Sequence, residues 1–465
     1  MKKSPPSDPL EKIKSSGLSR GLSLLQLTVS SGSSLMGLKV GDLFSSKENR
    51  KKRFDTFLGK QVFQLVEELG QLKGSIMKAG QLLSVYGEHF LPPEINEILR
   101  SLQSKGRPVV WREMHRVLLQ QLGEEKLQEL EIDTTPIGAA SLGQVYKARW
   151  KKNGALLALK VQYPGVDQAI DSDLKALQKI LSFSQLLPSR AGFDALFQEI
   201  RMLLHYEVDY ARELQTICTY RKWLTSDPRF IVPQVYPEFS GPRVLAMSYE
   251  EGLDVEDPSI QALSQERRNR LALSAMDLMF REIFVWKTVQ TDPHFGNFRI
   301  RLNEAGQDQW VLLDFGAVRK FPARYIDPFS RLVRGSLHTD VQEVIAAGTE
   351  LGFLRPEDSE TVLALFCDLC LTAVEGFEPG YESPSIDGSD AGKTPYLWDQ
   401  SDLISRLTKL AKDAIFAFRL RPPPREALFL DRKMMGTYTL LVKLGLQFGP
   451  RKLLLQYVDP IKKSK

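Results

Sequence analysis

The sequence predicts an α+β protein of two lobes, a small mixed lobe followed by a larger and mostly helical lobe, with a cleft between them. Runs rich in β-formers and turn residues gather within residues 131–250, whereas helical periodicity dominates on both sides of that stretch. The composition is that of an ordinary globular chain. Of its 465 residues 43% are hydrophobic and 26% are charged, which is enough to bury at least one sizeable core.

Residues 1–53 are predicted to form a basic, partly disordered tail rich in Ser, Gly and Lys. They hold eleven Lys and Arg against four Asp and Glu, so this segment carries +7 while the whole chain carries only +5. A nucleic-acid-binding protein more often spreads its basic residues across a folded face, so we expect no nucleic-acid partner. The alternative to a solvated tail is a peripheral contact between this segment and anionic lipid, helped by its leucines.

Residues 54–130 are predicted to form a helical extension. Apolar side chains at steps of three and four between Phe54 and Leu83 mark a long amphipathic helix, which a pair of prolines at 92–93 ends. Shorter helices are expected at 94–103 and 111–130. On this spacing alone Lys78 and Gln81 fall on the polar side of the long helix, where solvent exposure is the default expectation.

The small lobe is assigned to residues 131–250 and the larger lobe to 251–465. In the small lobe the turn signal Asn153-Gly154 joins two β-rich runs into a hairpin. In the larger lobe a second hairpin interrupts a series of helices. The expected strands are 141–150, 155–162, 231–236, 243–249, 298–302 and 310–313, and the expected helices are 170–187, 193–224, 264–286, 328–351, 359–374, 401–418 and 425–446.

The cysteine content and the hydropathy limit where the protein resides. Three cysteines rule out a disulfide scaffold and fit a reducing compartment. No apolar run reaches the length of about 18 residues that a spanning helix needs, and the N-terminus does not resemble a secretory signal. We therefore expect a cytoplasmic protein, peripheral on the inner face of a membrane if its basic tail binds lipid.

The first chemical motif is a G-x-A-x-x-G-x-V pattern that runs from Gly138 to Val145, with a lysine at 160 on the partner strand of the hairpin. Protein kinases cover the phosphates of ATP with such a loop and hold phosphate oxygens with such a lysine. Alone, the pattern would also fit an ordinary hairpin, and Ala140 stiffens the loop where a kinase has glycine. The predicted nucleotide-binding residues are Gly138, Ala139, Ala140, Ser141 and Lys160.

The second motif is a D-x-x-x-x-N pattern, from Asp292 to Asn297, that is followed after one hairpin by Asp314-Phe315-Gly316. In kinases the asparagine and the second aspartate bind Mg²⁺, and the first aspartate lies near the attacking group. All these elements in this order are hard to obtain by chance. They predict a protein-kinase-like fold with ATP and Mg²⁺ as cofactors, and with Asn297 and Asp314 as metal ligands.

The chain resembles the UbiB family of atypical kinase-like proteins, also called aarF-domain proteins, which are implicated in ubiquinone and other isoprenoid-lipid metabolism. Lys78-Ala79-Gly80-Gln81 matches the family's K-x-G-Q, and Glu207-Val208-Asp209 matches its E-x-D element. Gln290-Thr291-Asp292-Pro293 matches its catalytic loop, which replaces the usual H-R-D. The resemblance covers roughly residues 54–450.

The resemblance implies a bilobal protein-kinase-like fold whose helical N-terminal extension packs over the cleft, where protein kinases accept a peptide. That shield argues against protein substrates. It also implies that Glu213 pairs with Lys160 and that Asp292 orients the attacking hydroxyl or water. The residues implied to form a lid that sets which acceptor enters are Lys78, Gln81, Glu207 and Asp209.

The expected function is that of an ATP-binding, Mg²⁺-dependent atypical kinase-like protein, an ATPase or small-molecule phosphotransferase that supports ubiquinone or isoprenoid-lipid homeostasis. The implied partners are a nucleotide and an isoprenoid lipid or quinone precursor. The alternative is a nucleotide-gated protein that binds a lipid or a partner without productive phosphotransfer, and an ordinary protein kinase is a third and weaker reading. Gly138 stands where the family usually has Ala, so the nucleotide preference is expected to be closer to that of ordinary kinases.

Overall fold

The computed structural model describes residues 74–86, 109–140, 142–183, 190–379, 395–417 and 424–459. The predicted basic tail, the first part of the long helix, the helix at 94–103 and Ser141 lie outside these ranges. The chain divides into two compact units. The first consists of residues up to Gln215 with Gln234–Tyr249, and the second of Thr216–Pro233 with the residues from Glu250 onward. The four predicted sections (1–53, 54–130, 131–250 and 251–465) stay a prediction.

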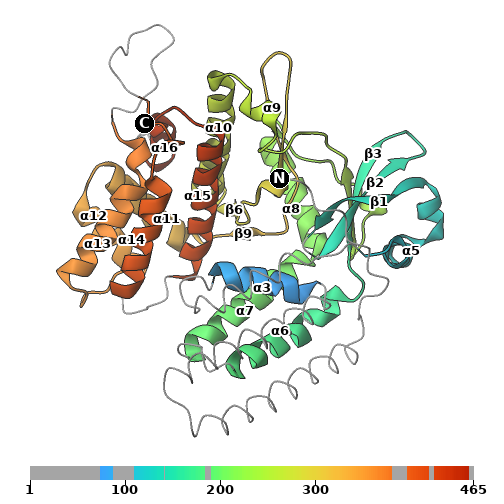
Figure 1. The fold of residues 1–465 in the computed structure, drawn as a ribbon, viewed down its shortest axis with the longest axis horizontal. Coiled ribbons are helices and arrows are strands. Elements are labelled where there is room, and N and C mark those ends of the chain that lie inside the picture. The colour runs from blue at the N-terminus through green and yellow to red at the C-terminus, as the bar shows by residue number, and fades with distance from the viewer. Residues whose placement is uncertain are drawn as a thin grey trace, which may run out of the picture. The chain divides into compact units, whose positions relative to one another are not determined.

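The first unit contains a four-stranded antiparallel sheet (Figure 1). Its order is β1 (Leu130–Ala140), β2 (Gly143–Trp150), β3 (Leu156–Gln162) and β5 (Val244–Ser248). The predicted hairpin of β2 and β3 is confirmed. Strand β1 was not predicted because most of its side chains are exposed and its register shifts on either side of Pro136, so no clean alternation marks it.

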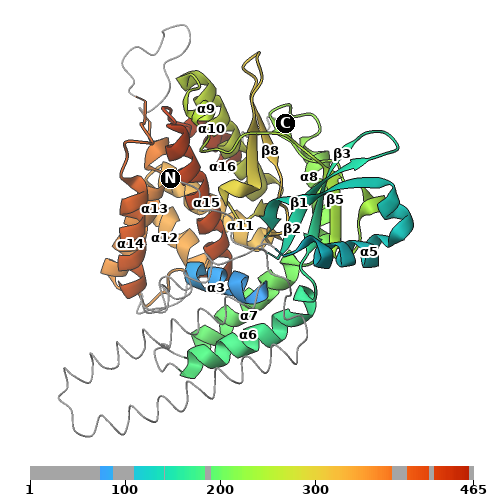
Figure 2. The same ribbon diagram turned by 45° about the vertical axis from the view of Figure 1, so that its right-hand side comes forward.

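Helices cover the rest of the first unit. α5 (Trp111–Gln128) packs on the sheet, with the ring of Trp111 edge-on to that of Tyr146. α3 (Ser75–Tyr86), α6 (Val166–Phe183) and α7 (Arg190–Glu207) lie side by side in both views (Figures 1 and 2). The predicted single helix over 193–224 is wrong, because the chain leaves helical geometry at 208–209 and α8 (Tyr210–Leu224) starts afresh.

The second unit is mainly helical. Its long helices α10 (Gln265–Phe280) and α15 (Arg425–Leu444) pack against each other, and α10 continues into a π-helical turn, Arg281–Val285. The predicted single helix over 328–351 is wrong: its first half ends at Leu337, Thr339 has φ +56°, and Asp340 caps the next helix. The other helices are α9 (Pro258–Gln261), α11 (Ala323–Leu337), α12 (Val341–Glu350), α13 (Glu360–Ala373), α14 (Leu403–Ala417) and α16 (Arg451–Val458).

Short strands complete the second unit. β4 (Phe230–Ile231), β8 (Gln309–Leu312) and β7 (Phe298–Arg301) form a three-stranded sheet, in which the predicted hairpin of β7 with β8 is confirmed. β6 (Thr288–Gln290) pairs with β9 (Val318–Lys320). Single 3₁₀ turns occur at Phe295–Asn297 and Glu375–Phe377 in this unit, and at Pro237–Phe239 in the first unit. Within the ranges that the structure describes, no helix is both long enough and apolar enough to span a bilayer.

Candidate active site

Lys160 and Glu213 form a buried ion pair in the first unit. The Nζ of Lys160, on β3, lies 2.8 Å from Oε1 and 3.0 Å from Oε2 of Glu213, and the two residues are 7% and 1% exposed. The same Nζ lies 5.4 Å from the centre of the Tyr210 ring. Strand β3 and the first turn of α8 therefore hold an ammonium group in a fixed place, and the two residues paired by the family resemblance are brought together.

The segment 138–140, the start of the G-x-A-x-x-G-x-V pattern, lies at the end of β1 and pairs with β2. Gly138 pairs with Val145, which pairs in turn with Lys160, so the segment and the lysine share one row across the sheet. Gly138 and Ala139 are exposed. At Gly143 a Cβ atom would lie 2.3 Å from the carbonyl oxygen of Val161, so only glycine lets β2 approach β3 this closely. The exposed segment can therefore meet a ligand beside the row that contains Lys160.

Lys78 is buried, and the expectation of solvent exposure drawn from its helical spacing is wrong. The residue is only 4% exposed, in a helix that packs against both α6 and α7, and its Nζ lies 2.5 Å from Oε1 of Glu207. Gln81, one turn further on, is half-buried. The K-x-G-Q and E-x-D elements thus meet through one charge pair.

The two carboxylates of the E-x-D element make different contacts. Glu207 ends α7 and pairs with Lys78, whereas Oδ1 of Asp209 accepts a hydrogen bond of 2.9 Å from the backbone N–H of Arg212. Asp209 is therefore the cap of α8, the helix that carries Glu213. Between them, the carbonyl of Val208 accepts a 2.6 Å hydrogen bond from Nε2 of Gln162 on β3.

Two antiparallel pairings bring the candidate catalytic and metal-binding residues together in the second unit. In the β7–β8 hairpin Phe298 pairs with Leu312, which places Asn297 beside the residue that precedes Asp314. The backbone N–H of Leu313 donates to the carbonyl of Asn297 over 3.0 Å. The β6–β9 pair holds the other ends of the same two loops together.

The side chain of Gln290 links these loops directly. Its Oε1 accepts a 2.6 Å hydrogen bond from the backbone N–H of Asp292, and its Nε2 donates to the carbonyl of Asp314 over 3.4 Å. Thr291 adds a 2.8 Å hydrogen bond from its hydroxyl to the carbonyl of Ala317. The Gln-Thr pair of the Q-T-D-P motif therefore fixes the position of Asp292 relative to Asp314.

The donor set of these loops fits Mg²⁺. The amide nitrogen of Asn297 donates to the carbonyl of Asp292 over 2.9 Å, so its amide oxygen points away from that bond. Oδ1 of Asp314 accepts a 2.9 Å hydrogen bond from the N–H of Gly316. Among the described residues no cluster of three or more His, Cys, Asp or Glu could hold a metal by itself. One carboxylate and one amide oxygen suit Mg²⁺, which takes few protein ligands and completes its shell with phosphate and water.

Arg432, on α15, also contacts Asp292, and this contact is not predicted by the sequence. Its Nη2 donates to Oδ1 of Asp292 over 2.7 Å. No motif marks this arginine, since it lies on a helix far along the chain from the candidate catalytic loop, residues 290–297, so only the packing of α15 reveals it.

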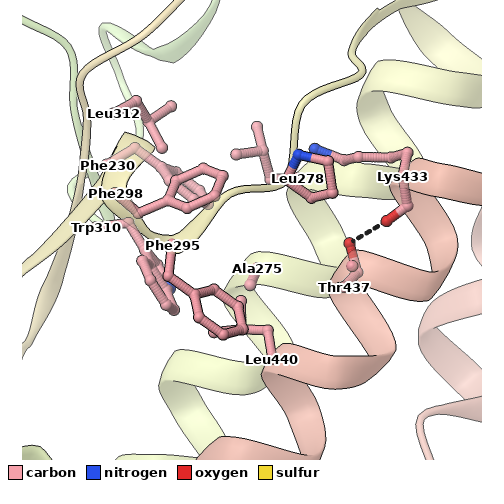
Figure 3. Close-up of a pocket in the computed structure, with 12 residues that line it drawn as sticks. Phe230, Ala275, Leu278, Phe295, Phe298, Trp310, Leu312, Lys433, Thr437 and Leu440 are labelled. Atoms are coloured by element: carbon pink, nitrogen blue, oxygen red, sulfur yellow. Dashed lines mark hydrogen bonds between the residues drawn. The ribbon is translucent and has the colours of Figure 1, made fainter. Parts of the chain in front are cut away.

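A mostly apolar pocket lies beside the candidate catalytic loop in the second unit (Figure 3). Pro293 and Phe295 of the loop form part of its wall, and the rings of Phe298 and Trp310 come from the β7–β8 hairpin. Thr437 lines its α15 side and donates a 2.9 Å hydrogen bond to the carbonyl of Lys433. The pocket thus offers apolar contact surface next to Asp292.

Comparisons with known proteins agree on one family. Residues 101–347 match the family model described as the ABC1 atypical kinase-like domain. The chain is 32% identical over 383 residues to the mitochondrial atypical kinase COQ8 of Saccharomyces cerevisiae, which covers 82% of this chain and 73% of that protein. It is 30% identical to the mitochondrial atypical kinase COQ8B of Danio rerio over 86% of this chain, but it spans only 61% of that relative's length.

A solved structure shares the fold. The Mycobacterium tuberculosis protein Rv3197, determined in complex with erythromycin, superposes with a TM-score of 0.55 over 89% of this chain and 98% of its own. The two sequences are 24% identical, so this similarity concerns the fold alone. Together with the family match, it confirms the predicted α+β kinase-like class.

Proposed function

Because the chain belongs to the ABC1 family of atypical kinase-like proteins, the UbiB family, we propose that it binds ATP with Mg²⁺ and transfers or hydrolyses the terminal phosphate. The observation that carries this proposal is the buried pair of Lys160 with Glu213. A carboxylate that holds a lysine in place presents an ammonium group to phosphate oxygens without further ordering. The exposed backbone of Gly138 and Ala139, with Ala140 and Ser141, would cover the phosphates.

In this proposal Asn297 and Asp314 hold Mg²⁺, which would neutralise charge on the phosphates when it is bound. Asp292 orients the attacking hydroxyl or water. The hydrogen bonds of Gln290 to both aspartate loops would keep the two carboxylates at a constant relative position, which this division of roles requires.

A small-molecule acceptor is favoured over a protein. Residues 315–322 alone separate Asp314 from the start of α11, and Val318–Lys320 of this segment pair with β6. The long activation segment on which protein kinases carry their phosphorylation site therefore has no room there. The proposed lid of Lys78, Gln81, Glu207 and Asp209 would restrict the acceptor further.

The small pocket beside Pro293 has a mostly apolar lining, which would suit contact with a short apolar part of an acceptor. We infer a role in ubiquinone or isoprenoid-lipid homeostasis, with an isoprenoid lipid or quinone precursor as the partner. Contact with the membrane would be peripheral, through the basic residues 1–53.

The test is phosphate release by the purified full chain with ATP, with and without Mg²⁺, and with vesicles of anionic phospholipid or an isoprenoid phenol. Asp314→Asn is expected to abolish Mg²⁺-dependent release, whereas the matched control Asp413→Asn, an exposed aspartate on α14, keeps it. Undiminished release by Asp314→Asn refutes the assignment. Nucleotide-dependent lipid binding without any release would favour the binding-protein alternative.

A further inference from the structure

Glu282 is a buried carboxylate that the proposed function leaves without a role. It is 1% exposed and lies in the π-helical turn that follows α10. Its Oε1 accepts a 2.8 Å hydrogen bond from the hydroxyl of Tyr220, and its Oε2 lies 2.6 Å from Nζ of Lys433 on α15. The backbone N–H of Gln290 also donates to Oε1, over 3.4 Å. Three elements of the second unit therefore converge on one carboxylate.

This arrangement is costly in terms of stability alone. Lys433 is 5% exposed, and a buried ion pair is often no more stabilising than well-packed apolar side chains of the same volume. The π-helical turn is a rare backbone form that occurs often at functional sites, and Lys287, just after it, has φ +50°. Because these features lower stability, they indicate that the region serves to fix the positions of particular groups rather than to stabilise the fold.

Two residues that contact Glu282 also contact the proposed catalytic and metal-binding loops directly. Gln290, which donates to Glu282, is the residue whose side chain holds Asp292 and Asp314. The ring of Tyr220 packs edge-on against Phe315, which follows Asp314, with 5.0 Å between ring centres.

The hydroxyl of Tyr220 remains a donor. Burial first, and then the charge of Glu282, hold the pKa of Tyr220 well above its ordinary value, so the hydroxyl keeps its proton. It also lies 3.2 Å from the carbonyl of Thr288 in β6. The tyrosine thus ties the carboxylate to the strand that leads into the catalytic loop.

We propose that Glu282 is a positioning residue: held by Tyr220 and Lys433, it fixes β6 and Gln290 so that Asp292 and Asp314 keep their mutual geometry. The role rests on the function proposed for those two aspartates. Neighbouring residues of α15 would then act on the catalytic loop from two directions, Lys433 through Glu282 and Arg432 through Asp292.

The experiment compares Tyr220→Phe, which keeps the ring on Phe315 and removes the hydroxyl, with a double variant, Glu282→Leu with Lys433→Met, which removes both buried charges together. The matched control is Tyr457→Phe, because Tyr457 also donates its hydroxyl to a carboxylate of this unit, that of Asp277. The measurements are kcat and KM for ATP, the unfolding midpoint, and amide hydrogen exchange of residues 288–297.

Both variants are expected to lower kcat by about tenfold or more with little change in KM, because a small displacement of reacting groups is enough for such a loss. Exchange should quicken within 288–297 and stay unchanged elsewhere. Wild-type kcat and wild-type exchange in both variants overturn the proposal. So does a lower unfolding midpoint with unchanged turnover per folded molecule, which is the mark of a merely structural role.

Failure of the proposed function would look different. If the wild type releases no phosphate, that function fails, but the exchange data still decide the inference. Faster exchange confined to 288–297 in the two variants supports a positioning role of Glu282, and unchanged exchange refutes it.

Discussion

Arg432 and Asp292 form a charge-assisted hydrogen bond of 2.7 Å, with side chains that are 18% and 16% exposed. The arginine comes from α15 and the aspartate from the loop that follows β6. Within the proposed function, a guanidinium at this place lies beside the residue that orients the attacking group. It can stabilise negative charge that develops on the transferred phosphoryl group.

We therefore predict that Arg432→Met lowers Mg²⁺-dependent ATP turnover by about 100-fold, the size expected for the loss of one preorganised electrostatic donor. Arg432→Lys should keep part of the activity, since it keeps the charge but loses the planar fork. Phosphate release measures both. Arg406→Met is a suitable control, because Arg406 also pairs with carboxylates of this unit, those of Glu375 and Asp402. Equal turnover in Arg432→Met and the wild type would contradict the prediction.

Gly436 on α15 leaves room for Pro293 of the catalytic loop. A Cβ atom at this glycine would lie 2.2 Å from Cγ and 2.3 Å from Cβ of Pro293, and a proline ring cannot rotate away. Gly436→Ala should therefore displace the loop and lower turnover about tenfold. An alanine favours the helix by about 1 kcal/mol, which partly offsets the clash in the free energy of unfolding.

Phosphate release and urea unfolding separate these two effects of Gly436→Ala. Thr439→Ala, a half-buried position on the same helix, is the control and should leave turnover unchanged. If Gly436→Ala is as active as that control, the loop tolerates displacement and the argument from the close contact fails.

The parts of the site that could be predicted are those encoded by contiguous residues. Asp292 and Asn297 lie in one short loop, and the β7–β8 hairpin that carries the chain to Asp314 has a local strand pattern. Hairpin strands pair with their sequence neighbours, so alternation and turn residues suffice to find them. The kinase-like class followed from the order of such local motifs.

The parts that could not be predicted depend on packing between distant segments. Lys78 has the spacing of an exposed helical residue, but it is buried in a helix that packs against α6 and α7. Glu282 and Lys433 look like ordinary surface charges of two helices until α10 and α15 are packed together. The helical periodicity of residues 193–224 also predicted one continuous helix through Asp209. The side chain of Asp209 instead caps a new helix there.

The pair of buried Lys78 with half-buried Glu207 predicts a strong coupling in stability. Lys78→Met alone leaves the Glu207 carboxylate without this ammonium, and Glu207→Gln alone leaves the ammonium without this carboxylate. Each single change should lower the free energy of unfolding by up to about 3 kcal/mol, because it removes one partner of a charge pair whose lysine is almost fully buried. The double variant should lose clearly less than the sum of the two.

Urea unfolding of the wild type, both single variants and the double variant gives the coupling energy. The exposed pair of Arg201 with Asp171, on α7 and α6, is the control and should show a coupling below about 1 kcal/mol. Additive losses for Lys78 and Glu207 would show that the two charges do not depend on each other.

The capping hydrogen bond of Asp209 predicts that this side chain stabilises α8, the helix that carries Glu213. Asp209→Ala removes the acceptor for the N–H of Arg212 and should lower the free energy of unfolding by about 1 kcal/mol. Asp209→Asn keeps a capping oxygen and should lose much less. Thermal unfolding of the three proteins distinguishes a cap from a purely electrostatic role in the lid, in which case Asn would be as damaging as Ala.

The cluster of Asp227, Arg229, Asp277 and Arg281 predicts how stability depends on pH. The hydrogen bond from the side chain of Arg229, aided by its backbone N–H and the charge of Arg281, lowers the pKa of Asp227 to about 2. Since the folded pKa lies below the unfolded value of about 3.9, the unfolded chain binds the proton more tightly. The contribution of Asp227 is therefore complete above about pH 5 and is lost as the pH falls towards about 2. Its size should be about 1 kcal/mol, because the partner arginines are partly exposed and screened.

Urea unfolding at several pH values between about 5 and 2 checks this. Asp227→Asn cannot ionise, so its free energy of unfolding should start lower and fall less steeply over that range than that of the wild type. Asp413→Asn, which removes an exposed carboxylate, should follow the wild-type curve. If Asp227→Asn falls as steeply as the wild type, the acid sensitivity arises from other carboxylates, and the arginines do not hold Asp227 in its charged form.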